Sequence, residues 1–132
     1  IRYATKNNFV GQPVYKEARA FLQKDAAEAL KKVNIKMHTL GYGLLVFDGY
    51  RPWDVTKLFY DVTSKENKKF VADPKEGSRH NRGCAIDVSL YDLVTLTRKH
   101  TTEFKIDQFL FQSIQLGFCF MEGLFIFTFH RQ

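Results

Sequence analysis

Residues 84–90 read Cys-Ala-Ile-Asp-Val-Ser-Leu, and from Ile86 onward apolar and polar side chains alternate. Because successive residues of a strand point to opposite faces, the apolar members would share one face, whereas Asp87 and Ser89 would share the other. The strand directly follows a polar loop that contains a histidine. A carboxylate on the polar face of a strand, next to such a loop, is the arrangement expected of a functional site.

Two helices and one more strand are expected before this stretch. An apolar stripe with steps of three and four residues predicts a helix that stops at Gly41. The stripe consists of Leu22, Ala26, Leu30, Val33, Met37 and Leu40. The apolar run 43–47 fits a buried strand, and Pro52 suits the first turn of a second helix. The buried face of that helix would be Val55, Leu58, Phe59 and Val62. Helices and strands without a β-α-β rhythm predict an α+β fold with an antiparallel sheet.

The last part of the chain differs in composition from the rest. Residues 103–116 fit a third helix, and residues 118–130 are aromatic and β-prone. Eight of the 13 phenylalanines lie after residue 100. We therefore expect one domain over residues 1–132, whose final segment follows its own pattern.

Composition limits the classes of protein to which the chain could belong. Its 132 residues suit one domain, and 45% apolar with 26% charged residues is a globular balance. No apolar run approaches the ~20 residues of a membrane span. The net charge is +6, but the lysines are scattered without a nucleic-acid motif, so no nucleic-acid partner is expected. Cys84 and Cys119 fit small buried residues better than a disulfide or zinc ribbon. The compartment and the oligomeric state stay open.

The stretch 78–87, Ser-Arg-His-Asn-Arg-Gly-Cys-Ala-Ile-Asp, carries a candidate metal pair. His80 offers a neutral imidazole nitrogen and Asp87 a carboxylate oxygen, and both suit Zn²⁺. Gly83 lets the chain turn between loop and strand, so that Asp87 can face His80. A catalytic zinc usually has three protein ligands. The pair alone therefore also fits a surface histidine and an aspartate satisfied by local hydrogen bonds.

A second candidate lies in Asp48-Gly49-Tyr50-Arg51-Pro52. An arginine held between a glycine turn and a proline is well placed to bind a carboxylate or to stabilise a developing oxyanion. The alternative is a turn in which Arg51 pairs with Asp48 or Asp54.

Taken together with the start of the chain, these motifs resemble those of the D-alanyl-D-alanine dipeptidases, zinc peptidases of the VanX type. Three blocks match that family in order, and the resemblance covers residues 1 to about 95. The blocks are Tyr3-Ala4-Thr5-Lys6-Asn7-Asn8-Phe9, then Gly41 to Leu45 with Asp48 to Pro52, and finally Ser78 to Asp87 with Leu90 and Tyr91.

The resemblance implies a small antiparallel sheet with helices packed on it, and a role for each motif. His80 and Asp87 would be two of three zinc ligands, Arg51 would polarise the scissile carbonyl, and Ser78 would contact the bound dipeptide. The implied reaction is hydrolysis of the dipeptide D-Ala-D-Ala, with zinc activating a water and a glutamate acting as base. The implied setting is cell-wall precursor turnover or glycopeptide resistance.

Residues 96–132 depart from the family. The third ligand and the base of the family lie in a C-terminal Glu-Trp-Trp-His, whereas the only tryptophan here is Trp53. His130 is the nearest candidate for the third ligand and Glu122 for the base, and His100 with Glu103 is another pair. A decayed, truncated or frame-disrupted ending would explain the mismatch. We expect weak or absent dipeptidase activity, and the alternative is a non-catalytic relative that binds a dipeptide or a metal.

Overall fold

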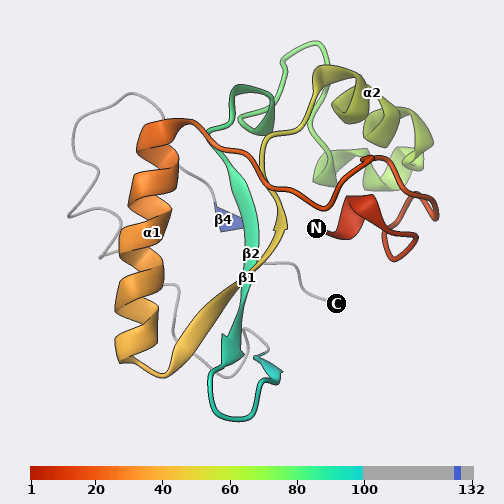
Figure 1. Cartoon of the computed structure of the whole chain (residues 1–132). Coiled ribbons are helices and arrows are strands. Elements are labelled where there is room, and N and C mark those ends of the chain that lie inside the picture. The colour runs from red at the N-terminus through yellow and green to blue at the C-terminus, as the bar shows by residue number, and fades with distance from the viewer. Residues whose placement is uncertain (100–126, 129–132) are drawn as a thin grey trace.

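The fold is organised around two antiparallel strands, β1 (Tyr42–Asp48) and β2 (Ile86–Asp92). The computed structural model describes residues 1–99 and 127–128 (Figure 1). The two-residue strand β3 (Arg98–Lys99) is antiparallel to β2, whereas β4 (Phe127–Thr128) pairs parallel with the start of β2. The prediction of an α+β fold, with helices packed on a small antiparallel sheet, is confirmed, with β4 as a parallel addition.

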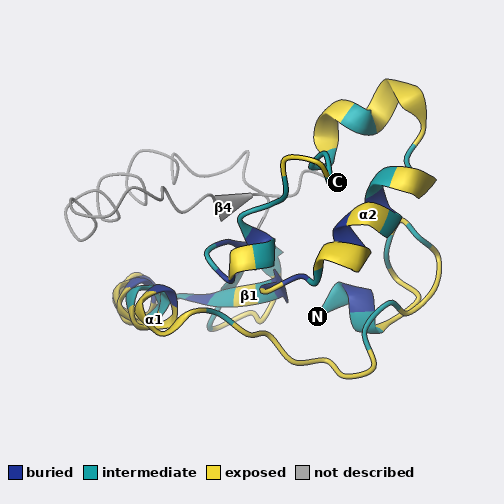
Figure 2. Ribbon diagram, turned by 90° about the horizontal axis from the view of Figure 1, so that it is seen from above, coloured by how far each residue is buried: buried dark blue, intermediate teal, exposed yellow. Residues whose placement is uncertain are grey.

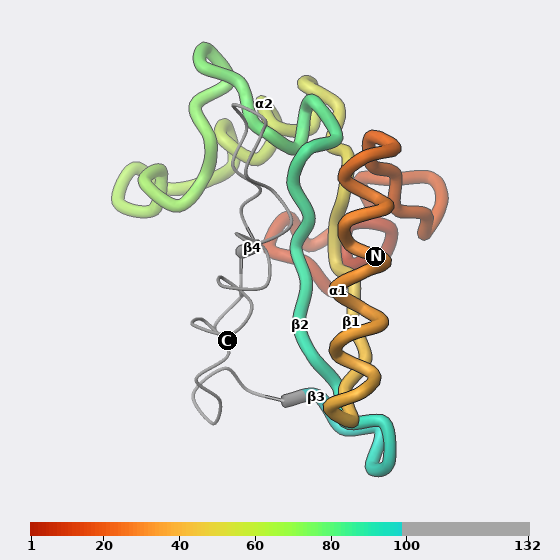
Figure 3. The backbone as a smooth tube through the Cα atoms, turned by 90° about the vertical axis from the view of Figure 1, so that its left-hand side faces the viewer, coloured from red at the N-terminus to blue at the C-terminus, as the bar shows by residue number. Residues whose placement is uncertain are grey.

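Helix α1 (Lys24–Thr39) covers the strand pair (Figures 1 and 3). Val33 and Met37 of α1 pack against Leu90 of β2, and burying each such side chain stabilises the fold by about 1.5–3 kcal/mol. The middle of the predicted apolar stripe therefore faces the sheet, whereas Leu22 and Leu40 lie outside the helix. Leu40 is 48% exposed because the chain leaves the helix there and turns through Gly41, whose φ is +82°.

A second apolar cluster joins the N-terminal segment to helix α2 (Trp53–Val62). Tyr3, in the short 3-10 helix η1 (Arg2–Ala4), packs against Val55 and Phe59 of α2. Figure 2 colours these buried parts of η1 and α2 dark blue. Val62, predicted to be inward, is 50% exposed because it is the last residue of the helix. This cluster anchors the N-terminal segment on α2.

Two further 3-10 helices complete the described elements, η2 (Lys65–Phe70) and η3 (His80–Arg82). No residue of η2 is buried. Cys84 is half-buried rather than buried. Among the described residues, no helix is long and apolar enough to cross a membrane. The predicted helix 103–116, Cys119 and nearly all of the aromatic stretch 118–130 lie outside the described residues.

Candidate metal site and its arginine

Strand register brings two buried aspartates together at one end of the sheet. Asp48 ends β1 and pairs with Asp87 of β2, after a bulge that follows Val46. The exposed fractions of Asp48 and Asp87 are 0% and 4%. Because neighbouring residues across two strands lie side by side, these two carboxylates share one small volume.

The loop after α2 adds His80 to the same volume. His80 opens η3, and its backbone carbonyl accepts a hydrogen bond from Arg51 N at 3.0 Å. Gly83 ends η3 with φ +65°, and a Cβ there would come within 3.1 Å of the backbone nitrogen of Gln23. The predicted turn at Gly83 is therefore present. It requires glycine because the backbone is left-handed there and because a side chain would crowd the backbone of Gln23.

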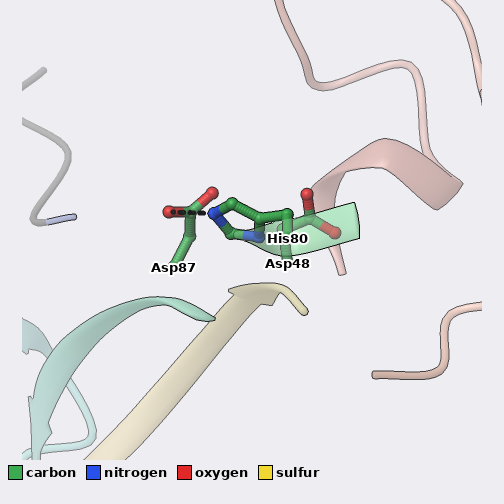
Figure 4. Close-up of side chains that lie close together, drawn as sticks. All are labelled: Asp48, His80 and Asp87. Carbon is green, nitrogen blue, oxygen red and sulfur yellow. Dashed lines mark ion pairs between the residues drawn. The ribbon is translucent and has the colours of Figure 1, made fainter. Parts of the chain in front are cut away.

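The His80 ring is oriented by the backbone of the neighbouring turn. Its Nδ1 lies 2.8 Å from the carbonyl oxygen of Gly49, and since a carbonyl only accepts, Nδ1–H donates. The neutral ring then presents the lone pair of Nε2, which lies 3.6 Å from Asp87 Oδ1 (Figure 4). Two donors on a tetrahedral zinc lie roughly 3.4 Å apart, from bond lengths of about 2.0–2.1 Å. A histidine whose other nitrogen donates to a carbonyl is also the usual form of a metal ligand. The pair therefore fits zinc.

Asp48 is close enough to be counted with this pair, because donor atoms of Asp48, His80 and Asp87 all lie within 4.8 Å of one another. In Figure 4, however, the Asp48 carboxylate lies on the far side of the His80 ring from Asp87. The position of Asp48 thus differs from that of a third donor facing Nε2.

The partners of Asp48 explain its position. Its Oδ2 accepts hydrogen bonds from Arg51 Nε at 2.9 Å and Nη2 at 2.7 Å. Its Oδ1 accepts from the Tyr15 hydroxyl at 3.0 Å and from Gly49 N at 2.9 Å. Four donors therefore converge on one fully buried carboxylate. Asp48 is the counter-ion of Arg51, which is the alternative that the sequence had left open for this arginine.

Arg51 also reaches the metal pair. Its Nη2 lies 3.4 Å from Asp87 Oδ2, while the guanidinium stacks on the Phe59 ring at 4.8 Å and the Tyr3 ring at 5.7 Å. The hydrogen bonds from the Arg51 side chain to the two aspartates use Nε and Nη2.

Burial and mutual attraction shape the ionisation of this cluster. Burial raises the pKa of Asp48, and the Arg51 guanidinium opposes that rise. Burial lowers the pKa of Arg51, but the Asp48 carboxylate more than offsets this effect and moves that pKa above its usual value. Burial, followed by the charge of Asp48, raises the pKa of Tyr15. Arg51 is therefore charged and Tyr15 protonated at neutral pH.

Of the remaining predicted site residues, Ser78 lies beside His80 and the others lie outside the described part of the chain. Ser78 is half-buried beside His80, and its hydroxyl accepts a hydrogen bond from His80 N at 3.2 Å. His130, Glu122 and the pair His100 and Glu103 lie outside the described residues. Sequence reasoning missed Tyr15, which lies 33 residues from the aspartate it binds. It also missed the bonds that Asn81 makes within the site, although Asn81 stood inside the metal motif.

Comparison with known proteins identifies the family of the chain. The family of D-Ala-D-Ala dipeptidases, peptidase family M15, matches residues 1–101. A D-alanyl-D-alanine dipeptidase of Escherichia coli is 35% identical over 92 residues, which cover 70% of this chain and 47% of that protein. Those of Enterococcus faecium and Streptomyces coelicolor are 39% and 33% identical over 71% of this chain and 55% of their own length. The chain spans about half the length of the curated relatives it matches. The chain belongs to the D-Ala-D-Ala dipeptidase family of M15 peptidases.

Proposed function

We propose that the chain carries the zinc-binding and carbonyl-polarising part of a D-Ala-D-Ala dipeptidase site. The observation that carries the proposal is the His80 and Asp87 pair, 3.6 Å apart, with the histidine tautomer set by Gly49 and Arg51 alongside. Family membership supports the dipeptide as substrate. His80 and Asp87 would be two zinc ligands, and Arg51 would act on the substrate.

The residues divide the chemistry among them. Zinc, when bound, supplies a Lewis acid and activates water for attack. His80 and Asp87 would hold the ion, and Ser78 would contact the dipeptide. Arg51 directs a fixed positive charge toward the carbonyl oxygen as negative charge develops on it. Removing one such donor typically lowers kcat by about 10²–10³-fold.

Two parts of the proposed site fall on residues outside the described ones. His130 is the proposed third ligand and Glu122 the proposed base, because the Glu-Trp-Trp-His expected of the family is missing. A base that accepts the proton of the attacking water contributes about 10²–10⁴-fold to rate. We therefore expect the chain to bind zinc and to turn over D-Ala-D-Ala weakly or not at all.

The missing motif also favours a second candidate function, a non-catalytic relative that binds the dipeptide or a metal. Metal binding and turnover separate the two. A dipeptidase binds about one zinc and loses D-Ala release on chelation. A binding relative takes up the metal or the dipeptide and releases no D-Ala.

The test is zinc binding by calorimetry, together with D-Ala release from D-Ala-D-Ala. We expect about one zinc per chain, with binding lost in His80→Ala and in Asp87→Ala. His38→Ala is the matched control, because His38 is exposed on α1 and should leave binding unchanged. Zinc binding that survives in both His80→Ala and Asp87→Ala would show that the metal pair is assigned wrongly. Vigorous turnover abolished by Arg51→Ala would show that the expected loss of activity is wrong.

A further inference from the structure

The candidate site is divided between two chain segments that are joined by direct hydrogen bonds. One segment, 49–51, carries Arg51, and the other, 78–83, carries His80. Arg51 N donates to the His80 carbonyl at 3.0 Å, and His80 Nδ1 donates to the Gly49 carbonyl at 2.8 Å. The Asn81 side chain supplies a third bond, from Nδ2 to the Arg51 carbonyl at 2.8 Å. The two segments thus hold one another in place.

Asn81 uses both ends of its carboxamide for this purpose. Its Oδ1 accepts from Ser78 N at 2.7 Å, and its Nδ2 donates a second bond to Thr56 Oγ1 of α2 at 2.8 Å. Thr56 is only 1% exposed, so this bond ends in the protein interior. A carbonyl can only accept and a backbone N–H can only donate, so the partners fix the orientation of the amide. One side chain therefore joins the His80 loop, the Arg51 backbone and helix α2.

We propose that Asn81 is a positioning residue that holds His80 and Arg51 as one preorganised unit. The effect of Asn81 on catalysis rests on the proposed function, whereas its hydrogen-bonded coupling of segments 49–51 and 78–83 does not. A metal ligand and a carbonyl-polarising arginine act together only while their separation is fixed. Displacement by about 1 Å can cost roughly 10²-fold in rate. Without Asn81, the Arg51 carbonyl loses its side-chain donor, and the two segments keep only the backbone bond and the His80 ring bond.

The decisive measurement needs no metal, because amide hydrogen exchange reports on the Arg51 N–H bonded to His80. We expect Arg51 to exchange about tenfold faster in Asn81→Ala, which corresponds to one lost hydrogen bond. Asn81→Asp should give the same result at neutral pH, since its carboxylate can accept from Ser78 N but cannot donate to Arg51. The amide of Val88, in the β1–β2 pair, should keep its protection in both variants.

Asn8→Ala is the matched control for a general loss of stability. Asn8 is also half-buried and also closes a turn with both ends of its carboxamide, but in the N-terminal segment. Its substitution should loosen that turn and leave Arg51 exchange close to wild type. If Asn8→Ala accelerates Arg51 exchange as much as Asn81→Ala does, the effect is global and the proposal fails.

Metal binding provides the second measurement. We expect zinc affinity to fall about tenfold in Asn81→Ala, together with a changed visible spectrum of the cobalt-substituted protein. A wild-type chain that binds no zinc would refute the proposed function. The exchange of the Arg51 amide would still test whether Asn81 holds the two segments together. Wild-type Arg51 exchange in Asn81→Asp would overturn the inference. If the wild-type chain binds metal and both Asn81 variants give the wild-type cobalt spectrum, the inference is also overturned.

Discussion

Replacing Asp48 by asparagine tests whether this residue serves Arg51 or the metal. The substitution keeps the shape of the side chain and an oxygen that can accept from Tyr15 and Gly49. It removes the charge and turns an NH₂ group toward the guanidinium, which lies 2.7 Å from the carboxylate in the native structure. Arg51, 9% exposed, then loses its nearest counter-ion.

The expected destabilisation follows from the burial of the pair. Removing one partner of a buried ion pair typically costs about 3–5 kcal/mol, because the other charge stays in the interior uncompensated. Asp87, 3.4 Å from Arg51, can recover part of this loss if the guanidinium moves toward it. We therefore expect Asp48→Asn to lower the free energy of unfolding by about 3 kcal/mol. Urea denaturation followed by circular dichroism measures this value directly.

The same substitution should weaken zinc binding indirectly, because a guanidinium that moves onto Asp87 competes with the ion for that carboxylate. A double variant, Asp48→Asn with Arg51→Met, removes the competing charge. We expect it to be more stable than Asp48→Asn alone and to recover zinc affinity.

A loss of stability below about 1 kcal/mol in Asp48→Asn would refute the argument, since that is the range of an ordinary neutral hydrogen bond. Zinc affinity that stays low in the double variant would instead identify Asp48 itself as a ligand.

Three further substitutions test the surroundings of the site. Gly83→Ala should lower stability by about 1–2 kcal/mol in urea denaturation, because its φ of +65° is left-handed and its Cβ would meet the backbone of Gln23. Tyr15→Phe removes one of the donors to Asp48 and should cost about 1.5–3 kcal/mol in the same assay, as expected for a bond to a charged group. Burial raises the pKa of Tyr3 from 10.0 to about 12, so the unfolded chain loses this proton first as the pH rises. The stabilisation by Tyr3 is therefore complete below pH 10 and falls by about 3 kcal/mol between pH 10 and 12, and Tyr3→Phe should flatten that part of the stability profile.

Local patterns in the sequence were sufficient to predict the main elements. The stripe in α1 and the alternation in 86–90 each depend on neighbours within one element, so their periods can be read without knowing the fold. The sequence predicted which residues form the polar face of β2, but not that this face is buried. Ser89 is 3% exposed, and Arg98 Nε of β3 donates to its hydroxyl at 3.2 Å. Both faces of this strand are therefore covered, one by apolar side chains and the other by polar partners.

The side chains that meet at the candidate site could be predicted to lie together when short motifs contained them. His80, Asp87 and Arg51 all stand in such motifs, with a glycine that marks the turn. Tyr15 has no comparable signal, because the packing of the N-terminal segment against α2 is what brings its hydroxyl to Asp48. Asn81 lies within a motif, but its partners Arg51 and Thr56 come from another part of the chain. Buried polar networks of this kind depend on tertiary packing, which spacing along the sequence does not encode.

The bulge in β1 has the largest effect of the features that the sequence did not predict. Val46 pairs with Val88 on the apolar face, and a regular ladder would next place Phe47 opposite Asp87 and Asp48 opposite Ile86. Directly opposed residues share a face, so Asp48 would then point toward the apolar core. The extra residue in β1 shifts the register by one and sets Asp48 opposite Asp87 instead. That single shift brings the counter-ion of Arg51 to the polar face of β2, and with it the arginine reaches the metal pair.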